Sequence, residues 1–356
     1  MVKNKTIIFF NGFFLPHLGG VETYTSALIE ELKKDYNIIV VTSNVPKSKS
    51  YEEKAGVKIF RLPVKNFLKE RFPIPKKNAE YKDLMKRIEA EKIDYIIINT
   101  RYYYTTFEGL KFAKLKNIRP IIIDHSSDYI LKPYERFCLP KILKYNPKFY
   151  AVSKRTASWL ETLGIKTQGI FYNAVKVKDF KKPKNSEIRL AFAGRLLEEK
   201  GIKLVLESFN ELKNRFNLEL VVIGDGPLYN SLNEEYKDVY FTGFISKNEV
   251  LKELEKTDIF LYPTLYPEGF PTVVLEAASK KCAVLATDRG GITELIDDSS
   301  GIILKENAED LTKKLEKLLK EPEKIRKYGE KIFQKVSENF TLEKTAEKVR
   351  KELEND

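Results

Sequence analysis

The length, composition and charge of this chain exclude several classes of protein. Its 356 residues suit two globular domains, and 42% hydrophobic with 32% charged residues exclude a disordered chain. No apolar run approaches the roughly 18–20 residues that cross a bilayer, the first residues lack a secretory signal pattern, and two cysteines cannot form a disulfide framework. We therefore expect a cytoplasmic protein, and its net charge of +12 indicates an anionic partner.

The first half of the chain alternates short apolar segments with longer amphipathic ones. Strands are expected at residues 6–10, 38–42, 57–62, 95–99, 121–124 and 149–152. Helical patterns separate most of them, for example over 21–34 and 79–90. Runs such as Ile96-Ile97-Ile98 are continuously apolar, which indicates strands buried on both faces of a parallel sheet covered by helices.

A polar segment at 176–186 contains a proline and many lysines, and we expect it to be a linker. The alternation then restarts, with strands expected at 188–193, 218–223, 239–242, 259–262 and 284–287. Helices are expected to begin near Gly201, Pro227, Ser246, Pro271 and Thr293. From Ala308 the pattern is almost wholly helical, with Thr341 placed as an N-cap. This order predicts an α/β protein of two doubly wound, Rossmann-like domains facing a cleft, 1–175 and 176–340, with a helical tail.

Ligands of such sheets bind beyond the carboxyl ends of the strands, and four loops at those positions carry polar or glycine-rich sequences. The loop at 14–22 contains Gly19 and Gly20, which let backbone amides at a helix start approach a phosphate. The loop at 193–201 contains Arg195 and Lys200, two cations suited to a pyrophosphate. The turn at 224–227 (Gly-Asp-Gly-Pro) is interpreted as structural support.

The fourth loop, at 267–276, carries two carboxylates eight residues apart. Pro271 opens the helix, so Glu268 lies in the loop and Glu276 inside the helix, and each can meet a different part of a ligand. Glu276 has apolar neighbours, and ribose hydroxyls would supply the hydrogen bonds that a buried carboxylate needs. The helix start near Thr272 offers a second place for an anion.

The two histidines, His17 and His125, both follow expected strands. At least one of them is expected to contact a ligand. The sequence has no Asp-x-Asp pair and no cluster with metal-ligand spacing, so we expect no metal and no other cofactor. Cationic side chains and helix starts would then neutralise a departing diphosphate.

Taken in order, these segments resemble the retaining glycosyltransferases of family 4, which have the GT-B fold of two Rossmann-like domains. The matching segments are 16–22 (Pro-His-Leu-Gly-Gly-Val-Glu), 172–175 (Tyr-Asn-Ala-Val), 194–201 (Gly-Arg-Leu, then Lys-Gly), 224–227, 241–243 (Phe-Thr-Gly), 268–276 (Glu-Gly-Phe-Pro, then Glu), 287–291 (Thr-Asp-Arg-Gly-Gly) and 340–341 (Phe-Thr). The resemblance implies that a final helix, about 341–356, returns to the N-terminal domain, which would bind the acceptor, while 176–340 would bind the donor.

The resemblance also assigns roles to individual residues. The donor-binding residues that it implies are Gly19, Gly20, Arg195, Lys200, Gly243, Phe244, Glu268, Gly269, Phe270, Pro271, Thr272 and Glu276. Among these, Glu276 would bind the ribose, and the backbone at Gly243 and Phe244 would contact the base. The catalytic residues that it implies are His125, Glu268, Arg195 and Lys200.

The implied reaction moves a hexose-type sugar from a nucleotide diphosphate with retention, by same-face attack in which the leaving phosphate helps to deprotonate the acceptor. UDP is the favoured carrier and GDP the alternative. Two departures from the family pattern, Ala174 in place of the commoner glycine and Ser126-Ser127 after His125, could alter sugar or acceptor contacts.

The uneven distribution of charge along the chain indicates the kind of acceptor. Residues 1–175 hold 31 Lys and Arg against 17 Asp and Glu, a net charge of +14, whereas 176–356 has a net charge of −2. Basic and apolar residues mix at 65–77 and 132–148, a composition found in elements that lie on anionic membranes. We therefore expect a glycan acceptor, either lipid-linked or soluble, and a peripheral position on the inner face of the cell membrane in the first case.

Three other classes of protein fit less well, in this order. A nucleotide-sugar epimerase of GT-B fold would lack the Glu-Gly-Phe-Pro set, and an NAD-dependent oxidoreductase would need the missing Gly-x-Gly-x-x-Gly fingerprint. A nucleic-acid-binding protein would explain the charge, but no recognition motif is present, so nucleic acid is not an expected partner.

Overall fold

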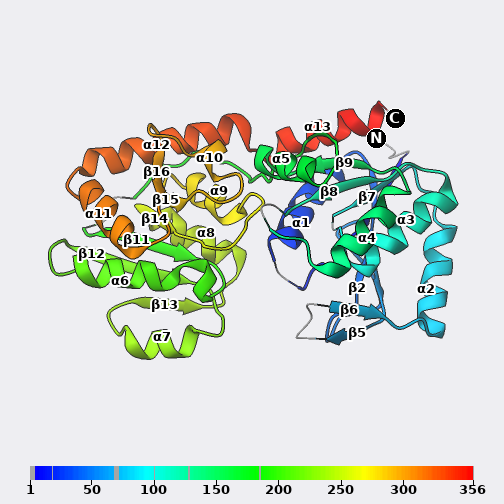
Figure 1. Ribbon diagram of the computed structural model, residues 1–356, viewed down its shortest axis with the longest axis horizontal. Coiled ribbons are helices and arrows are strands. Elements are labelled where there is room, and N and C mark those ends of the chain that lie inside the picture. Colours follow the sequence, from blue (N-terminus) through cyan, green and yellow to red (C-terminus); the bar gives the residue numbers. More distant parts are fainter. Residues whose placement is uncertain are drawn as a thin grey trace. The chain divides into compact units, whose positions relative to one another are not determined.

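The computed structural model describes residues 5–17, 19–67, 72–99, 101–126, 129–183 and 186–355, and the chain divides into two compact units (Figure 1). Unit 1 consists of Met1–Tyr172 with Leu342–Asp356, and unit 2 of Asn173–Thr341. Each unit has a central, mostly parallel sheet with helices packed on it, so the predicted fold class is confirmed. Among the described residues, no helix is both long and apolar enough to span a membrane.

The sheet of unit 1 has the strand order β10-β9-β8-β7-β1-β2-β4-β3 and is parallel except for β3, which pairs antiparallel with β4. Its strands are β1 (Thr6–Phe10), β2 (Asn37–Ser43), β3 (Tyr51–Lys54), β4 (Val57–Leu62), β7 (Tyr95–Ile98), β8 (Ile121–Asp124), β9 (Lys148–Ala151) and β10 (Thr167–Ile170). The order reverses at β1, which pairs with β2 on one side and β7 on the other. Apolar runs predicted to be buried strands are therefore strands of this sheet.

Helices cover the unit 1 sheet, and a separate hairpin follows β4. The helices are α1 (Gly20–Leu32), α2 (Ala79–Ala90), α3 (Tyr104–Lys116), α4 (Pro133–Leu143), α5 (Lys154–Thr162) and α13 (Leu342–Glu354). The basic segment at 65–77 is largely the hairpin of β5 (Val64–Phe67) and β6 (Phe72–Pro75), and 68–71 lie outside the described residues.

The C-terminal helix α13 belongs to unit 1, where it packs on α1. Arg350 Nε is 2.8 Å from an oxygen of Asp35, and Lys148 Nζ is 2.7 Å from Glu352. The Thr345 hydroxyl donates to the Tyr172 carbonyl at 3.1 Å. Ion pairs and hydrogen bonds thus tie the last helix to the first unit in addition to its buried apolar face.

The sheet of unit 2 is wholly parallel, in the order β13-β12-β11-β14-β15-β16. Its strands are β11 (Ile188–Ala193), β12 (Leu218–Ile223), β13 (Tyr240–Gly243), β14 (Ile259–Tyr262), β15 (Ala283–Thr287) and β16 (Gly301–Leu304). Its helices are η1 (Glu198–Lys200), α6 (Ile202–Leu212), α7 (Tyr229–Glu235), α8 (Lys247–Lys256), α9 (Thr272–Ala278), α10 (Ile292–Leu295), α11 (Ala308–Leu319) and α12 (Pro322–Asn339).

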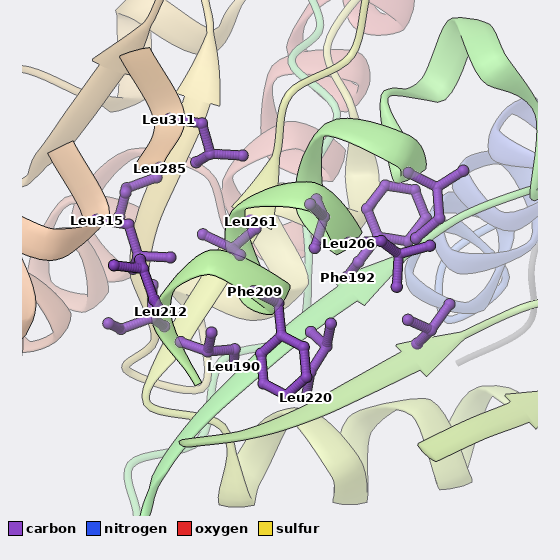
Figure 2. Close-up of a cluster of buried hydrophobic side chains, with 14 of the residues drawn as sticks. Leu190, Phe192, Leu206, Phe209, Leu212, Leu220, Leu261, Leu285, Leu311 and Leu315 are labelled. Atoms are coloured by element: carbon purple, nitrogen blue, oxygen red, sulfur yellow. The ribbon is translucent and has the colours of Figure 1, made fainter. Parts of the chain in front are cut away.

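The main core of unit 2 lies between one face of this sheet and helices α6 and α11 (Figure 2). Leu190 and Leu220 project from β11 and β12 toward Phe209 of α6, and Leu311 and Leu315 of α11 pack beside Leu285. All of these side chains are almost fully buried. Alternate residues of buried parallel strands supply such a core, while helices α9 and α12 contact β15.

The expected linker at 176–186 is held against unit 2. The Lys182 ammonium donates to the carbonyls of Lys280, Lys281 and Thr257, and Lys281 pairs with Asp179 at 3.0 Å. Val175 pairs with Thr341 in an isolated β-bridge. The described part of this segment is therefore anchored rather than free, because Lys182 reaches backbone carbonyls that the sequence pattern does not reveal.

Gly201 illustrates how tightly the loops after β11 and β14 pack. It has a positive φ of 77°, and a Cβ there would lie 2.0 Å from the Pro263 carbonyl oxygen. Gly243, in the same unit, also has a positive φ, of 64°, but a Cβ there would meet only ordinary contacts at 3.5 Å or more. Of these two glycines, only Gly201 therefore combines backbone strain with a clash.

We expect Gly201→Ala to destabilise unit 2 by about 3 kcal/mol, and Gly243→Ala by about 1 kcal/mol, the ordinary cost of a left-handed alanine. Native-state hydrogen exchange of the amides in β11, β12 and β14 measures both values. Equal losses of protection in the two variants would contradict the packing described for Gly201.

Candidate functional site

The strand order of unit 2 places one candidate site. The order reverses between β11 and β14, so the loops that follow these two strands leave the sheet side by side at its carboxyl edge. Such a reversal is where open α/β sheets bind ligands. The predicted residues Arg195 and Lys200 follow β11, and Glu268 follows β14.

Three polar side chains meet at this reversal. Lys200 Nζ lies 2.5 Å from Glu268 Oε1, and the Tyr262 hydroxyl donates to the same oxygen at 2.8 Å. Burial, and secondarily the Glu268 carboxylate, raise the pKa of Tyr262 well above its usual value, so the phenol stays protonated as a donor. The Lys200 ammonium also lies 4.5 Å from the centre of the Tyr266 ring. The two predicted residues Lys200 and Glu268 are therefore in direct contact.

The backbone around Glu268 is fixed by a neighbouring loop. Gly290 has a φ of 57°, and a Cβ there would lie 2.3 Å from the Glu268 carbonyl oxygen. The Gly291 amide donates to the Gly269 carbonyl at 2.8 Å, and the Asn173 side-chain amide donates to the Phe270 carbonyl at 2.5 Å. These contacts explain why segments 172–175 and 287–291 belong to the same ordered set of motifs as 268–271.

Arg195 and Thr272 have polar groups with no protein partner in the described part of the chain. Arg195 follows Gly194 directly after β11, and its exposed side chain forms no ion pair or hydrogen bond there. The Thr272 hydroxyl at the start of α9 is buried and likewise lacks a partner among those residues. Both groups are available to a ligand.

Glu276 lies on α9 and has a different partner from Glu268. It is 4% exposed, and its Oε1 contacts the ammonium of Lys247 at the start of α8. The predicted base-contact residues Gly243 and Phe244 lie just before α8, and Phe244 is 69% exposed. As the spacing suggested, the two glutamates do not form one carboxylate pair.

The remaining predicted residues, Gly19, Gly20 and His125, belong to unit 1. At the start of α1, the Glu22 carboxylate occupies the space beside Gly19, where a Cβ would lie 2.4 Å from its oxygen. Glu22 also pairs with His17 Nδ1 at 3.2 Å. We expected amides open to a phosphate at this helix start. A carboxylate already lies there, and Leu18 is outside the described residues.

Sequence reasoning missed Arg101, which anchors the loop that carries His125. Arg101 Nε lies 2.8 Å from Asp124, and both side chains are almost fully buried. The guanidinium lies over the rings of Tyr102 and Trp159, at 4.8 and 4.7 Å from their centres. No local sequence signal could have revealed this pair, because only the fold brings the neighbouring strands β7 and β8 together.

His125 is enclosed in unit 1. Its ring meets Tyr24 edge-on at 5.0 Å between centres, and its Nε2 is buried with no hydrogen-bond partner among the described residues. Burial lowers the pKa of His125 to about 4, and Asp124 opposes this shift only partly. The imidazole is therefore neutral at physiological pH, and Ser127 and Asp128 beyond it lie outside the described residues.

The sequence predicts that the protein holds no metal ion. Within the described ranges, no group of three or more His, Cys, Asp or Glu side chains is placed to hold a metal ion. Metal independence stays a prediction.

The lowered pKa of His125 predicts an acid-sensitive stability. The unfolded chain, with a histidine pKa near 6.5, takes up a proton before the native state does. The stability that the neutral His125 gives to the folded state is therefore fully present above about pH 6.5. It is lost as the pH falls toward 4, and the loss is about 2 kcal/mol at pH 5. Between pH 7 and 5, wild-type unit 1 should lose about 2 kcal/mol more stability than His125→Gln. Urea unfolding followed by the fluorescence of Trp159, the single tryptophan, measures this, and equal pH slopes would contradict it.

The chain matches two family profiles that together run through both units. The profile described as Glycosyltransferase Family 4 matches residues 18–178, and the profile described as Glycosyl transferases group 1 matches residues 175–335. A similar relative is the uncharacterized glycosyltransferase MJ1069 of Methanocaldococcus jannaschii, 25% identical over 390 residues and 99% of each chain. A phosphatidylinositol N-acetylglucosaminyltransferase protein from Arabidopsis thaliana is 24% identical over 331 residues, 87% of this chain and 73% of that protein.

Solved structures share the fold. Sucrose-phosphate synthase from Thermosynechococcus elongatus superposes with a TM-score of 0.82 and 16% identity, over 99% of both chains. Anabaena HepE, crystallised with UDP-glucose, has a TM-score of 0.75 and 16% identity, over 99% of this chain and 100% of that one. The matched profiles, the relatives and the GT-B neighbours agree, and the chain belongs to the family 4, group 1 glycosyltransferases.

Proposed function

We propose that this glycosyltransferase transfers a hexose-type sugar, with retention and without a metal, from a nucleotide diphosphate to a glycan acceptor. UDP is the favoured carrier, and GDP is the alternative. The observation that supports this most is the pairing of Lys200 with Glu268 at the strand-order reversal of unit 2, where the segment between β11 and α6 also carries the exposed cation Arg195. A diphosphate needs cations, and a sugar needs carboxylate and hydroxyl partners, in the same place.

The donor is assigned to unit 2. Arg195 and Lys200 hold the pyrophosphate and stabilise it as it leaves, and Glu268 accepts hydrogen bonds from the donor sugar with the backbone of 269–272 beside it. Glu276 binds the ribose, and the backbone at Gly243 and Phe244 meets the base. The crystallisation of Anabaena HepE with UDP-glucose supports a uridine carrier, since that protein shares the fold.

The chemistry follows from the charges of these residues. The leaving diphosphate gains negative charge in the transition state, and Arg195 with Lys200 neutralises it without a metal ion. The anomeric configuration of the sugar is retained because the acceptor hydroxyl attacks from the same face that the diphosphate leaves. The departing phosphate takes the proton of that hydroxyl. His125 is neutral, so it can donate or accept one hydrogen bond at the reacting centre but adds no charge.

A membrane-proximal acceptor is supported by the surface of α4. Every exposed side chain over 130–144 is apolar or cationic, because Glu135, the only acidic residue there, is buried. The exposed large apolar side chains are Ile130, Tyr134, Phe137 and Leu143, and the exposed cations are Lys132, Arg136, Lys141 and Lys144. We call these eight residues the α4 patch. Such a surface suits anionic headgroups, and the name of the Arabidopsis relative supports a lipid-linked acceptor.

Replacing Arg195 tests the donor site. Arg195→Ala should lower kcat/KM by roughly 10²–10³, equivalent to about 2.7–4 kcal/mol of transition-state stabilisation, because one preorganised cation is lost. Its stability should not change, since the side chain is exposed. Arg326→Ala, an exposed arginine of α12, is the matched control. Steady-state turnover of UDP- and GDP-sugars measures the effect, and near-normal turnover would refute the assignment to the pyrophosphate.

The same turnover assay distinguishes a glycosyltransferase from the alternative, a nucleotide-sugar epimerase. A transferase consumes the donor at a rate that depends on acceptor, in the presence or absence of EDTA, and releases the nucleotide diphosphate. An epimerase of GT-B fold would change the donor sugar without any acceptor, which would refute the transferase proposal.

The α4 patch is tested with vesicles. The double variant Ile130→Ser, Phe137→Ser should bind vesicles of phosphatidylglycerol and phosphatidylcholine at least about tenfold more weakly than wild type, because two exposed apolar anchors are lost. Leu115→Ser removes a similarly exposed leucine from α3 and should leave binding unchanged. Vesicle sedimentation at low salt measures both, and failure of the wild type to bind would count against the membrane-proximal acceptor.

A further inference from the structure

A lysine outside the predicted site contacts the glutamate that we assign to the ribose. Glu276 has a side chain 6% exposed, and the Lys247 side chain that reaches it is 45% exposed. The Lys247 side chain is therefore partly in solvent while its ammonium contacts a buried carboxylate. No motif in the sequence marked Lys247, because it lies 29 positions from Glu276 in the chain and on a different helix.

The burial of Glu276 makes this contact necessary. Glu276 lies on α9 between Leu275 and Ala277, both fully buried, so its carboxylate faces a strong desolvation penalty. Lys247 forms an ion pair with it through Oε1. The second oxygen, Oε2, accepts no hydrogen bond from any residue that the structure describes, so one acceptor of the carboxylate remains open.

The position of Lys247 is set by the backbone before it. Ser246 caps α8, its amide donating to Glu249 at 2.7 Å, and Lys247 is the first residue of the helix. The Gly243 carbonyl accepts from the Gly224 amide at 3.1 Å, which fixes the end of β13. The segment at Gly243 and Phe244, which we assign to the base, thus leads directly into the helix that places Lys247 against Glu276.

We propose that Lys247 is a positioning and specificity-determining residue of the nucleoside subsite. By holding Oε1 of Glu276, it compensates the buried charge and leaves Oε2 to accept a hydrogen bond from the 2′-hydroxyl of the ribose, so the site selects ribose over 2′-deoxyribose. This inference rests on the proposed function, since it needs a nucleotide at this site. An ion pair with a purely structural role would stabilise α8 against α9 and would not distinguish the two sugars.

The experiment compares UDP with 2′-deoxy-UDP, or GDP with 2′-deoxy-GDP if the wild type binds guanine nucleotides. Isothermal titration calorimetry measures both affinities for the wild type, Lys247→Met, Lys247→Arg and the matched control Lys252→Met, an exposed lysine of the same helix. Circular dichroism and a thermal melt check that each variant is folded.

The wild type and Lys252→Met should prefer the ribonucleotide by about tenfold, the worth of a hydrogen bond to a charged group. Lys247→Met should bind the ribonucleotide about tenfold more weakly and lose the preference, because Glu276 is left buried and uncompensated. Lys247→Arg should restore the preference. A folded Lys247→Met that keeps the wild-type preference would overturn this inference alone, whereas a wild type that binds neither UDP nor GDP would overturn the proposed function with it.

Discussion

The reversal of strand order between β11 and β14 is the constraint on which the candidate donor site depends. It brings together two loops whose residues Lys200 and Glu268 are 68 positions apart in the chain, and the Glu268 carboxylate accepts hydrogen bonds from both Lys200 and Tyr262. The contact is close enough that Gly201 cannot carry a side chain beside Pro263, and Gly290 is equally restricted beside Glu268. The glycines of these motifs are therefore explained by packing between loops, as well as by any approach of a ligand.

Charge is arranged differently in the two units. In unit 2, Lys200 and Lys247 are each held by a carboxylate, which fixes their positions before a ligand arrives, while Arg195 stays exposed and unpaired within the described chain. In unit 1, His125 is kept neutral by burial, and the Arg101–Asp124 pair beneath its loop is sealed from solvent. A preorganised cationic site and a neutral partner suit a reaction whose main charge develops on a departing diphosphate.

Much of this arrangement could be predicted from sequence, for identifiable reasons. Continuous apolar runs such as 96–98 and 121–123 predict buried parallel strands, and the apolar neighbours of Glu276 predict its burial. Strands β3 and β10 were not expected, because they are short and carry polar residues. Other features depend on three-dimensional contacts that local sequence patterns do not encode. These are the partners Lys247 and Arg101, the Glu22 carboxylate beside Gly19, and the anchoring of Lys182.

The most direct test of a metal-independent nucleotide-sugar site is thermal unfolding in the presence of UDP, GDP, ADP or NAD, each with and without EDTA. A ligand at about 100 times its Kd adds about 2.7 kcal/mol of stability, which is visible as a rise in Tm. The proposed function predicts a rise with UDP or GDP that EDTA does not change. A rise with NAD alone, or none with any nucleotide, would contradict it, and a rise with UDP that EDTA abolishes would contradict the metal-independent site.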